Sequence, residues 1–185
     1  MAPKTASLVV ALAIAVLATA GIASSMVSTG GGARVIHVYG GGRVGPGTFP
    51  SGNLTFPGPR DLSVDAHASG AAISGHLYYG NNEAANLIFG GDVTCLTVRG
   101  NRAAVGGVIR EGGDPATVDY GFVIFLADNG SPASSTRDQS SAAYIDPLSA
   151  PEWPRGFPHV CPDPNGAFNT DGYLDLHSGD IVVEG

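Results

Sequence analysis

Basic residues are scarce in this sequence. It has 9 Lys and Arg against 16 Asp and Glu in 185 residues, which gives a formal net charge of −7. A nucleic-acid backbone is bound by clustered Lys and Arg. The composition therefore excludes nucleic acid as an expected partner.

Charged residues of both signs are few as well. They make up 14% of the chain, whereas it holds 28 Gly and 13 Pro. This composition favours short strands and turns over long charged helices. The sequence also has no heptads and no repeat of fixed period, so a coiled coil and a solenoid are excluded.

Motifs for catalysis are also missing. No G-x-S-x-G sequence precedes a predicted helix, so no serine nucleophile is indicated. Carboxylate pairs for glycoside cleavage could be drawn from Asp65 with Asp119 or from Asp171 with Asp175. That chemistry depends on a separation of roughly 5 to 10 Å in space, which the sequence does not fix. We assign no catalytic residue and expect no cofactor.

The first residues have the composition of a secretory signal peptide. Lys4 precedes an uncharged apolar run over residues 6–23, and small residues follow. We expect residues 1–25 to be this signal and residues 26–33 to be a flexible spacer, with the protein secreted or at the cell surface. The alternative is that the run is kept as an anchor, because its length is at the lower limit for crossing a bilayer. The membrane is a partner only in that case.

Two cysteines, Cys95 and Cys161, are the only ones in the chain. An oxidising compartment favours their pairing as a disulfide. A metal site or a nucleophilic thiol is disfavoured, because neither cysteine has a CxxC partner and Cys95 lies in an apolar strand.

Residues 34–185 are expected to form a single all-β domain. At its centre, residues 92–110 alternate like two paired strands around a tight turn at Gly100-Asn101, where both residue types tolerate positive φ. Further strands are predicted over residues 34–39, 62–68, 73–79, 84–89, 118–127, 142–145 and 172–184, with Gly40 to Gly42 ending the first. About eight to nine short strands joined by local turns predict an antiparallel barrel or sandwich.

The interior of such a barrel is expected to be lined by Phe122, Ile124, Tyr79 and Leu96. These side chains either fill it or leave a cavity for an apolar ligand. Outside the strands, residues 147–164 carry six prolines and Trp153. They predict an irregular segment that crosses the domain without regular secondary structure and is held in place by Cys161 and by burial of the Trp153 ring.

The histidines and the acidic loops contain the residues that could bind a metal ion. His67 and His76 lie on neighbouring predicted strands, but His67 shares its face with Ser63 and Asp65, which favours a solvated face. Loop oxygens offer calcium candidates, although none fits the EF-hand spacing and the same residue types form ordinary turns. These candidates are Asp128, Asp138, Asp163, Asn165 and Asp171.

Three motifs carry a resemblance to known proteins: VTCL at residues 93–96, GNRA at residues 100–103 and SGDIVV at residues 178–183. Through them the chain resembles a loosely defined group of exported β-rich proteins from high-GC actinobacteria, over about residues 62–183. The resemblance implies a single exported β domain and supports the pairing of Cys95 with Cys161. It implies no catalytic residue and no ligand.

Taken as a whole, the sequence favours a secreted, non-enzymatic binding or structural module at the cell surface or outside the cell. The alternative is a secreted hydrolase that acts on polysaccharide or another extracellular polymer. A hydrolase requires a concave site with convergent carboxylates or a Ser-His pair, whereas a scaffold disperses its polar groups over loops.

Overall fold

The structure, a computed structural model, describes residues 34–80, 88–130 and 135–185. Strands account for nearly all of its regular structure, with one short 3-10 helix, η2. The elements are β1 (Val35–Val44), β2 (Gly47–Thr48), β3 (Thr55–Phe56), β4 (Arg60–Ser69), β5 (Ala72–Gly80), β6 (Phe89–Arg99), β7 (Arg102–Gly112), η2 (Pro115–Thr117), β8 (Gly121–Ala127), β9 (Gln139–Ser140), β10 (Tyr144–Asp146) and β11 (Leu174–Glu184).

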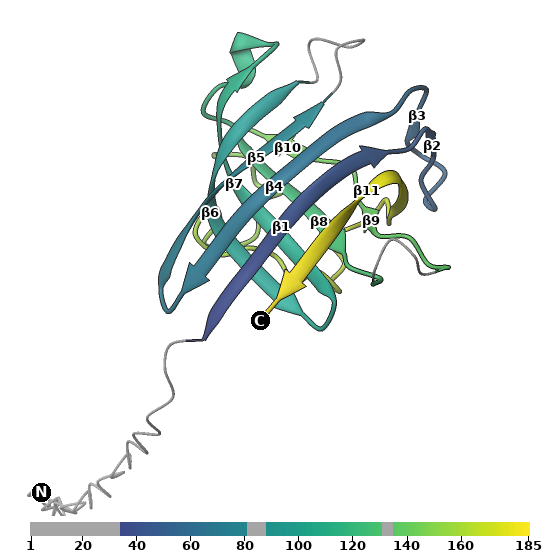
Figure 1. Ribbon diagram of the computed structural model, residues 1–185. Helices are drawn as coiled ribbons and strands as arrows, with labels where there is room; N and C mark the ends of the chain where they lie inside the picture. Colours follow the sequence, from purple (N-terminus) through teal and green to yellow (C-terminus); the bar gives the residue numbers. More distant parts are fainter. Residues whose placement is uncertain (1–33, 81–87, 131–134) are drawn as a thin grey trace, which may run out of the picture. The chain divides into compact units, whose positions relative to one another are not determined.

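Eight strands close into one antiparallel barrel. Neighbours follow the order β1, β4, β5, β6, β7, β8, β9 and β11, and β11 pairs back onto β1. Figure 1 shows β1 between β4 and β11, with β11 drawn in yellow near the C-terminus. β10 pairs with β8 farther along the same edge that β9 uses, and it is not one of the eight strands that close the barrel. Of the two predicted architectures, the structure is the barrel.

The interior of the barrel is filled by side chains. β4 alternates strictly, with Leu62, Val64 and Ala66 buried and the residues between them turned outward. The four residues predicted to point inward all belong to this interior cluster, as expected for a barrel of eight strands, whose lumen is just wide enough for side chains. They are Phe122, Ile124, Tyr79 and Leu96.

A second apolar layer covers the outside of β6, β7 and β8. All seven residues of β8 are buried, because Val123 and Phe125 pack outward against this layer while their neighbours face the lumen. The layer comes from residues 147–173, which include the irregular segment predicted over residues 147–164, and it contains Trp153 stacked on Phe157 with ring centroids 4.1 Å apart. The predicted burial of Trp153 is partial, since its ring is half-buried.

The disulfide between Cys95 and Cys161 fixes this layer to the barrel, as predicted. Both sulfurs lie over Gly106 of β7. A Cβ atom at Gly106 would stand 2.9 Å from the Cys95 Sγ and 3.1 Å from the Cys161 Sγ, so a side chain there would displace the bridge.

The boundary predicted between residues 84–89 and the central hairpin is wrong, because β6 already begins at Phe89 and includes Gly90 and Gly91. Two other predicted strand boundaries are also wrong. Gly40 to Gly42 do not end the first strand, because β1 continues through them to Val44. At Gly41 a Cβ atom would come within 2.2 Å of the Leu62 carbonyl oxygen on β4, so the glycines allow a close approach of strands that side chains would prevent. At the other boundary, β8 begins at Gly121, because η2 and a turn occupy residues 115–119.

The predicted signal peptide and spacer, residues 1–33, lie outside the described residues, as do residues 84–87 of one predicted strand. Within the part of the chain that the structure describes, no helical segment has the length and apolar character needed to cross a bilayer.

Candidate functional site

A small apolar pocket lies at the end of the barrel where β4 begins and β5 ends. Its volume is about 160 Å³, and its walls come from β3 and the residue before it, from β4, β5 and β10, and from the link between β9 and β10. The lining residues are Leu54, Phe56, Arg60, Tyr79, Ala142, Ala143 and Ile145. A cavity of about 150 Å³ is large enough for a molecule of the size of benzene.

Two polar groups stand in this apolar pocket. The Tyr79 side chain is almost fully buried, and its hydroxyl is the one buried side-chain polar atom without a hydrogen-bond partner among the described residues. Burial raises the pKa of the Tyr79 phenol, while the nearby Arg60 charge and, less strongly, the backbone of Ala143 oppose that rise. A buried hydroxyl without a partner costs about 1 to 3 kcal/mol, so the position is costly unless something binds there.

Arg60 supplies the charge. Only 5% of the residue is exposed, and its guanidinium carbon lies 4.9 Å from the centre of the Phe56 ring. A buried guanidinium next to a phenol that can donate a hydrogen bond attracts an anionic oxygen. The pocket is therefore suited to a small ligand with an apolar body and a carboxylate-like end.

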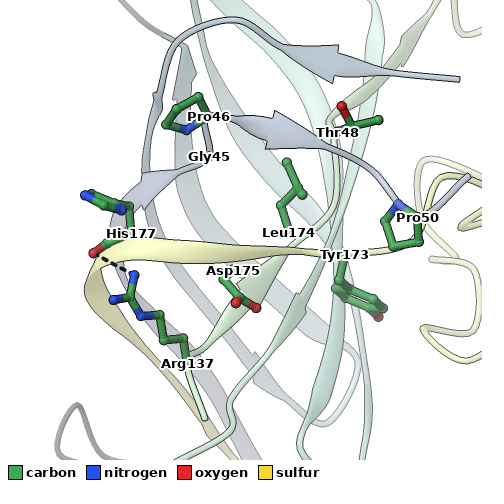
Figure 2. A pocket seen from close by; sticks show the side chains of 9 residues that line it. All are labelled: Gly45, Pro46, Thr48, Pro50, Arg137, Tyr173, Leu174, Asp175 and His177. Carbon is green, nitrogen blue, oxygen red and sulfur yellow. Dashed lines mark hydrogen bonds between the residues drawn. The ribbon is translucent and has the colours of Figure 1, made fainter. Parts of the chain in front are cut away.

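A larger but more open cleft, of about 340 Å³, lies beside β11 (Figure 2). Arg137, Asp175 and Tyr173 lie along one side of the strand, and Pro46 and Thr48 are on the other side. Two of its charged groups already bind within the protein: the Gln139 Nε2 donates to the Asp175 carboxylate at 2.8 Å, and Arg137 donates to the His177 carbonyl at 3.4 Å. This cleft therefore offers a ligand less unused bonding capacity than the barrel-end pocket.

Three carboxylates, those of Asp128, Asp138 and Asp180, lie near one another where β11 passes β9, a junction that we call the seam. Asp138 and Asp180 line a hollow of about 200 Å³ there. Asp138 is buried, and its two oxygens accept from the backbone N–H groups of Asn129 and Ile181, both at 2.7 Å. Asp128 likewise accepts from Val183 N at 3.1 Å. Asp128 and Asp138 are thus acceptors for backbone N–H groups of β11 where β9 no longer pairs with it.

The five calcium candidates are distributed over several places. The sequence grouping of Asp128 with Asp138 is reproduced at the seam, but Asp163 and Asn165 form a turn in which the Asp163 carboxylate accepts from Asn165 N and lies 3.6 Å from Arg99. Asn165 also accepts from Arg102, and Asp171 accepts from the Ser51 hydroxyl. The oxygens of these residues make hydrogen bonds inside the protein.

The histidine that faces His67 is His37 and not His76, the residue considered with it in the sequence. His67 lies directly opposite His37 of β1, and the two rings stack with centroids 3.8 Å apart. Both Nε2 atoms lie 2.8 Å from the same oxygen of Asp65. The hydrogen bond with His37, aided by the charge of His67, holds the pKa of Asp65 below its usual range. His76 is the cross-strand neighbour of Asp65 on β5.

Sequence reasoning missed three of these groups: Arg60, the unpartnered hydroxyl of Tyr79, and His37. Tyr79 was expected to point inward, but no sequence signal says whether a buried hydroxyl has a partner. His37 could have been paired with His67 only if the register between β1 and β4 had been known.

Fold and site together define a disulfide-bonded, closed antiparallel β barrel with a filled lumen and a small pocket at one end. Searches of protein-family models, curated proteins and solved structures found no match to the chain.

The seam carboxylates predict a pH effect. Partial burial and the neighbouring Asp138 and Asp128 raise the pKa of Asp180. The folded state therefore binds the Asp180 proton more tightly than the unfolded state, and this contribution to stability is lost as pH rises through the folded pKa. Asp180→Asn is expected to stabilise the protein at pH 7 by about 0.5 kcal/mol, since the group remains partly solvated.

The measurement is urea unfolding of both proteins at pH 7 and at pH 3.5. The gain should be smaller at the lower pH, where the Asp180 carboxyl is mostly protonated in the folded and in the unfolded state. Glu152→Gln, which removes one charge from an exposed position, should show no such gain. A gain for Asp180→Asn that is equal at both pH values would contradict the assignment.

Proposed function

We propose that the protein is a non-enzymatic extracytoplasmic binding module that holds a small carboxylate-bearing apolar molecule at the end of its barrel. The observation that carries this proposal is the unpartnered Tyr79 hydroxyl beside the Arg60 guanidinium in an otherwise apolar pocket. The disulfide is compatible with an extracytoplasmic location. The signal-like first residues and the resemblance to exported proteins support that location.

The Tyr79 phenol and the Arg60 guanidinium recognise the carboxylate of the ligand in different ways. The phenol donates one hydrogen bond and the guanidinium neutralises the negative charge, while Phe56, Leu54 and Ile145 contact the apolar body. A hydrogen bond to a charged group contributes about 1.5 to 3 kcal/mol, more than one between neutral groups. Specificity for an acid over its neutral analogue follows from this difference.

The arrangement of the acidic side chains supports a hydrolytic role less well than it supports a binding role. The acidic groups at the seam that come nearest to a carboxylate pair are Asp138 and Asp180, and both Asp138 oxygens already accept backbone N–H groups. A general acid or a nucleophile needs an oxygen free to reach its substrate. Polysaccharide incubated with the protein is therefore expected to release no new reducing ends.

Paired Tyr→Phe variants test the pocket. Tyr79→Phe is expected to raise the free energy of unfolding of the ligand-free protein by about 1 kcal/mol, because it removes a buried hydroxyl that has no partner. The control is Tyr144→Phe, whose hydroxyl accepts from Asp171 N at 3.2 Å and donates to the Asn169 side chain at 3.3 Å. That variant should lose stability by a similar amount. Urea unfolding measures both, and a loss for Tyr79→Phe would show that its hydroxyl has a partner.

Calorimetry with benzoate as the probe tests ligand binding. Benzoate should bind the wild type, benzyl alcohol should bind more weakly, and Tyr79→Phe should lower the benzoate affinity by about tenfold, the equivalent of one charge-assisted hydrogen bond. Arg60→Gln should lower it further, and Tyr144→Phe should leave it unchanged. Equal affinity of wild type and Tyr79→Phe, or no binding to the wild type, would overturn the proposed function.

A further inference from the structure

Three potential metal ligands converge on the outer surface of the barrel. His37, Asp65 and His67 each offer one ligand atom, an imidazole nitrogen or a carboxylate oxygen, and these three atoms all lie within 4.8 Å of one another. They come from two neighbouring strands of the barrel wall, β1 and β4. This cluster is independent of the barrel-end pocket.

The sheet itself positions the three side chains. His37 and His67 are direct cross-strand partners, and Asp65 precedes His67 by two residues, so all three project from the same face. Their neighbours Val38, Ala66 and Ala68 point into the lumen and are buried. Because the backbone under the cluster is paired on both sides, the ligands are held on rigid elements.

The distances suit a small divalent ion. Each imidazole Nε2 is 2.8 Å from the shared Asp65 oxygen. A tetrahedral ion with bonds of about 2.0 to 2.2 Å separates its ligand atoms by roughly 3.3 to 3.6 Å, so small side-chain rotations make room for it. The exposed fractions of the side chains, 27% for His37, 47% for His67 and 66% for Asp65, leave the remaining coordination positions open to solvent.

The ligand types select the class of metal. Two imidazoles and one carboxylate favour Zn²⁺ and its transition-metal neighbours over Ca²⁺ and Mg²⁺, which take oxygen ligands. The formal net charge of the chain, −7, also attracts cations. Without an ion, an exposed His-Asp-His cluster contributes little to stability.

Groups on the adjacent strands complete the surroundings. Glu184 of β11 is the cross-strand neighbour of His37 on the side away from His67, and it accepts from the Tyr39 hydroxyl at 3.3 Å. The Tyr39 ring lies 4.3 Å from the His37 ring. On the other side, His76 is opposite Asp65. These neighbours add a carboxylate and an imidazole next to the three ligands.

We propose that His37, Asp65 and His67 form a surface site for a divalent transition-metal ion, with Zn²⁺ as the probe ion. Three protein ligands leave at least one position for water or for a donor from a partner. Because a metal ion binds the neutral form of an imidazole, protons compete with the ion and binding weakens as the pH falls.

Calorimetric titration of ZnCl₂ into the protein, prepared without a polyhistidine tag, tests the site. The wild type should bind one ion and its thermal midpoint should rise, whereas CaCl₂ and MgCl₂ should give neither effect. Loss of an outer-shell partner typically lowers metal affinity by about 10- to 100-fold, so His67→Ala, which removes a ligand, should lower it by more than about 100-fold. Asp65→Asn, which keeps the shape of the side chain, should lower it by at least about tenfold.

His159→Ala is the matched control, because His159 is exposed on the outer layer far along the chain from the cluster. It should bind Zn²⁺ with wild-type affinity. Absence of binding heat and of a thermal shift in the wild type would overturn the proposal. So would wild-type affinity in both His67→Ala and Asp65→Asn.

Discussion

Replacing Cys95 and Cys161 together by alanine is expected to lower the free energy of unfolding by about 4 kcal/mol, because the bridge closes a long loop in the unfolded chain. The two residues are 66 positions apart in the sequence. Alanine is preferred to serine, since both sites are buried and a serine hydroxyl would lack a partner there. Urea unfolding of the variant and the wild type measures the difference.

The loss should be accompanied by a local change. Residues 147–173 cover β6 to β8 through the disulfide, the aromatic rings around Trp153 and a hydrogen bond from Thr94 to the Pro158 carbonyl at 2.6 Å. Without the bridge, limited proteolysis should cut this segment first while the barrel remains intact. The wild type treated with a reductant serves as the control and should show the same pattern. Unchanged stability together with unchanged cleavage would show that the other contacts hold the layer without the bridge.

The part of the fold that follows from local pattern was predictable. The central hairpin alternates in hydrophobicity and turns at Gly100-Asn101, and the structure pairs Arg99 with Arg102 across that turn. β4 and β5 were predicted for the same reason. The predicted end of β1 was wrong because three consecutive glycines, Gly40 to Gly42, are typical of a loop. In the barrel wall the same glycines allow the neighbouring strands to approach closely.

Closure of the barrel could not be predicted in the same way. β9 has only two residues, too few for a periodic signal, and it completes the ring between β8 and β11. Next to it, side chains add to the backbone hydrogen bonds: the Ser141 hydroxyl accepts from Phe125 N at 2.9 Å, and the Asp138 carboxylate accepts from Ile181 N. Such contacts join residues that are distant in sequence, so the choice between barrel and sandwich stayed open.

The candidate sites were less predictable than the fold. The sequence placed Tyr79 inside the barrel and His67 on an outer face, and both placements are confirmed. What makes them candidates is the arrangement of neighbours from other strands, Arg60 beside Tyr79 and His37 opposite His67. These neighbours depend on register and on barrel closure, which a single sequence does not contain.

Asp138 marks the seam at which the barrel depends on side chains, and its replacement is the second change expected to have a large effect. Asp138→Ala leaves the Ile181 N–H without its acceptor in a buried region and the Asn129 N–H without its acceptor in a partly buried one. Each buried unsatisfied group costs about 1 to 3 kcal/mol, so the free energy of unfolding should fall by about 3 kcal/mol.

Two further variants separate this effect from the loss of a charge. Asp138→Asn keeps one acceptor oxygen and should lose less stability than Asp138→Ala. Asp163→Ala removes an exposed carboxylate that accepts from Asn165 N in a surface turn, and it should cost about 0.5 kcal/mol or less. If urea unfolding gave similar small losses for Asp138→Ala and Asp163→Ala, the seam would be held by its flanking backbone pairs, β1 with β11 and β8 with β9, rather than by the Asp138 carboxylate.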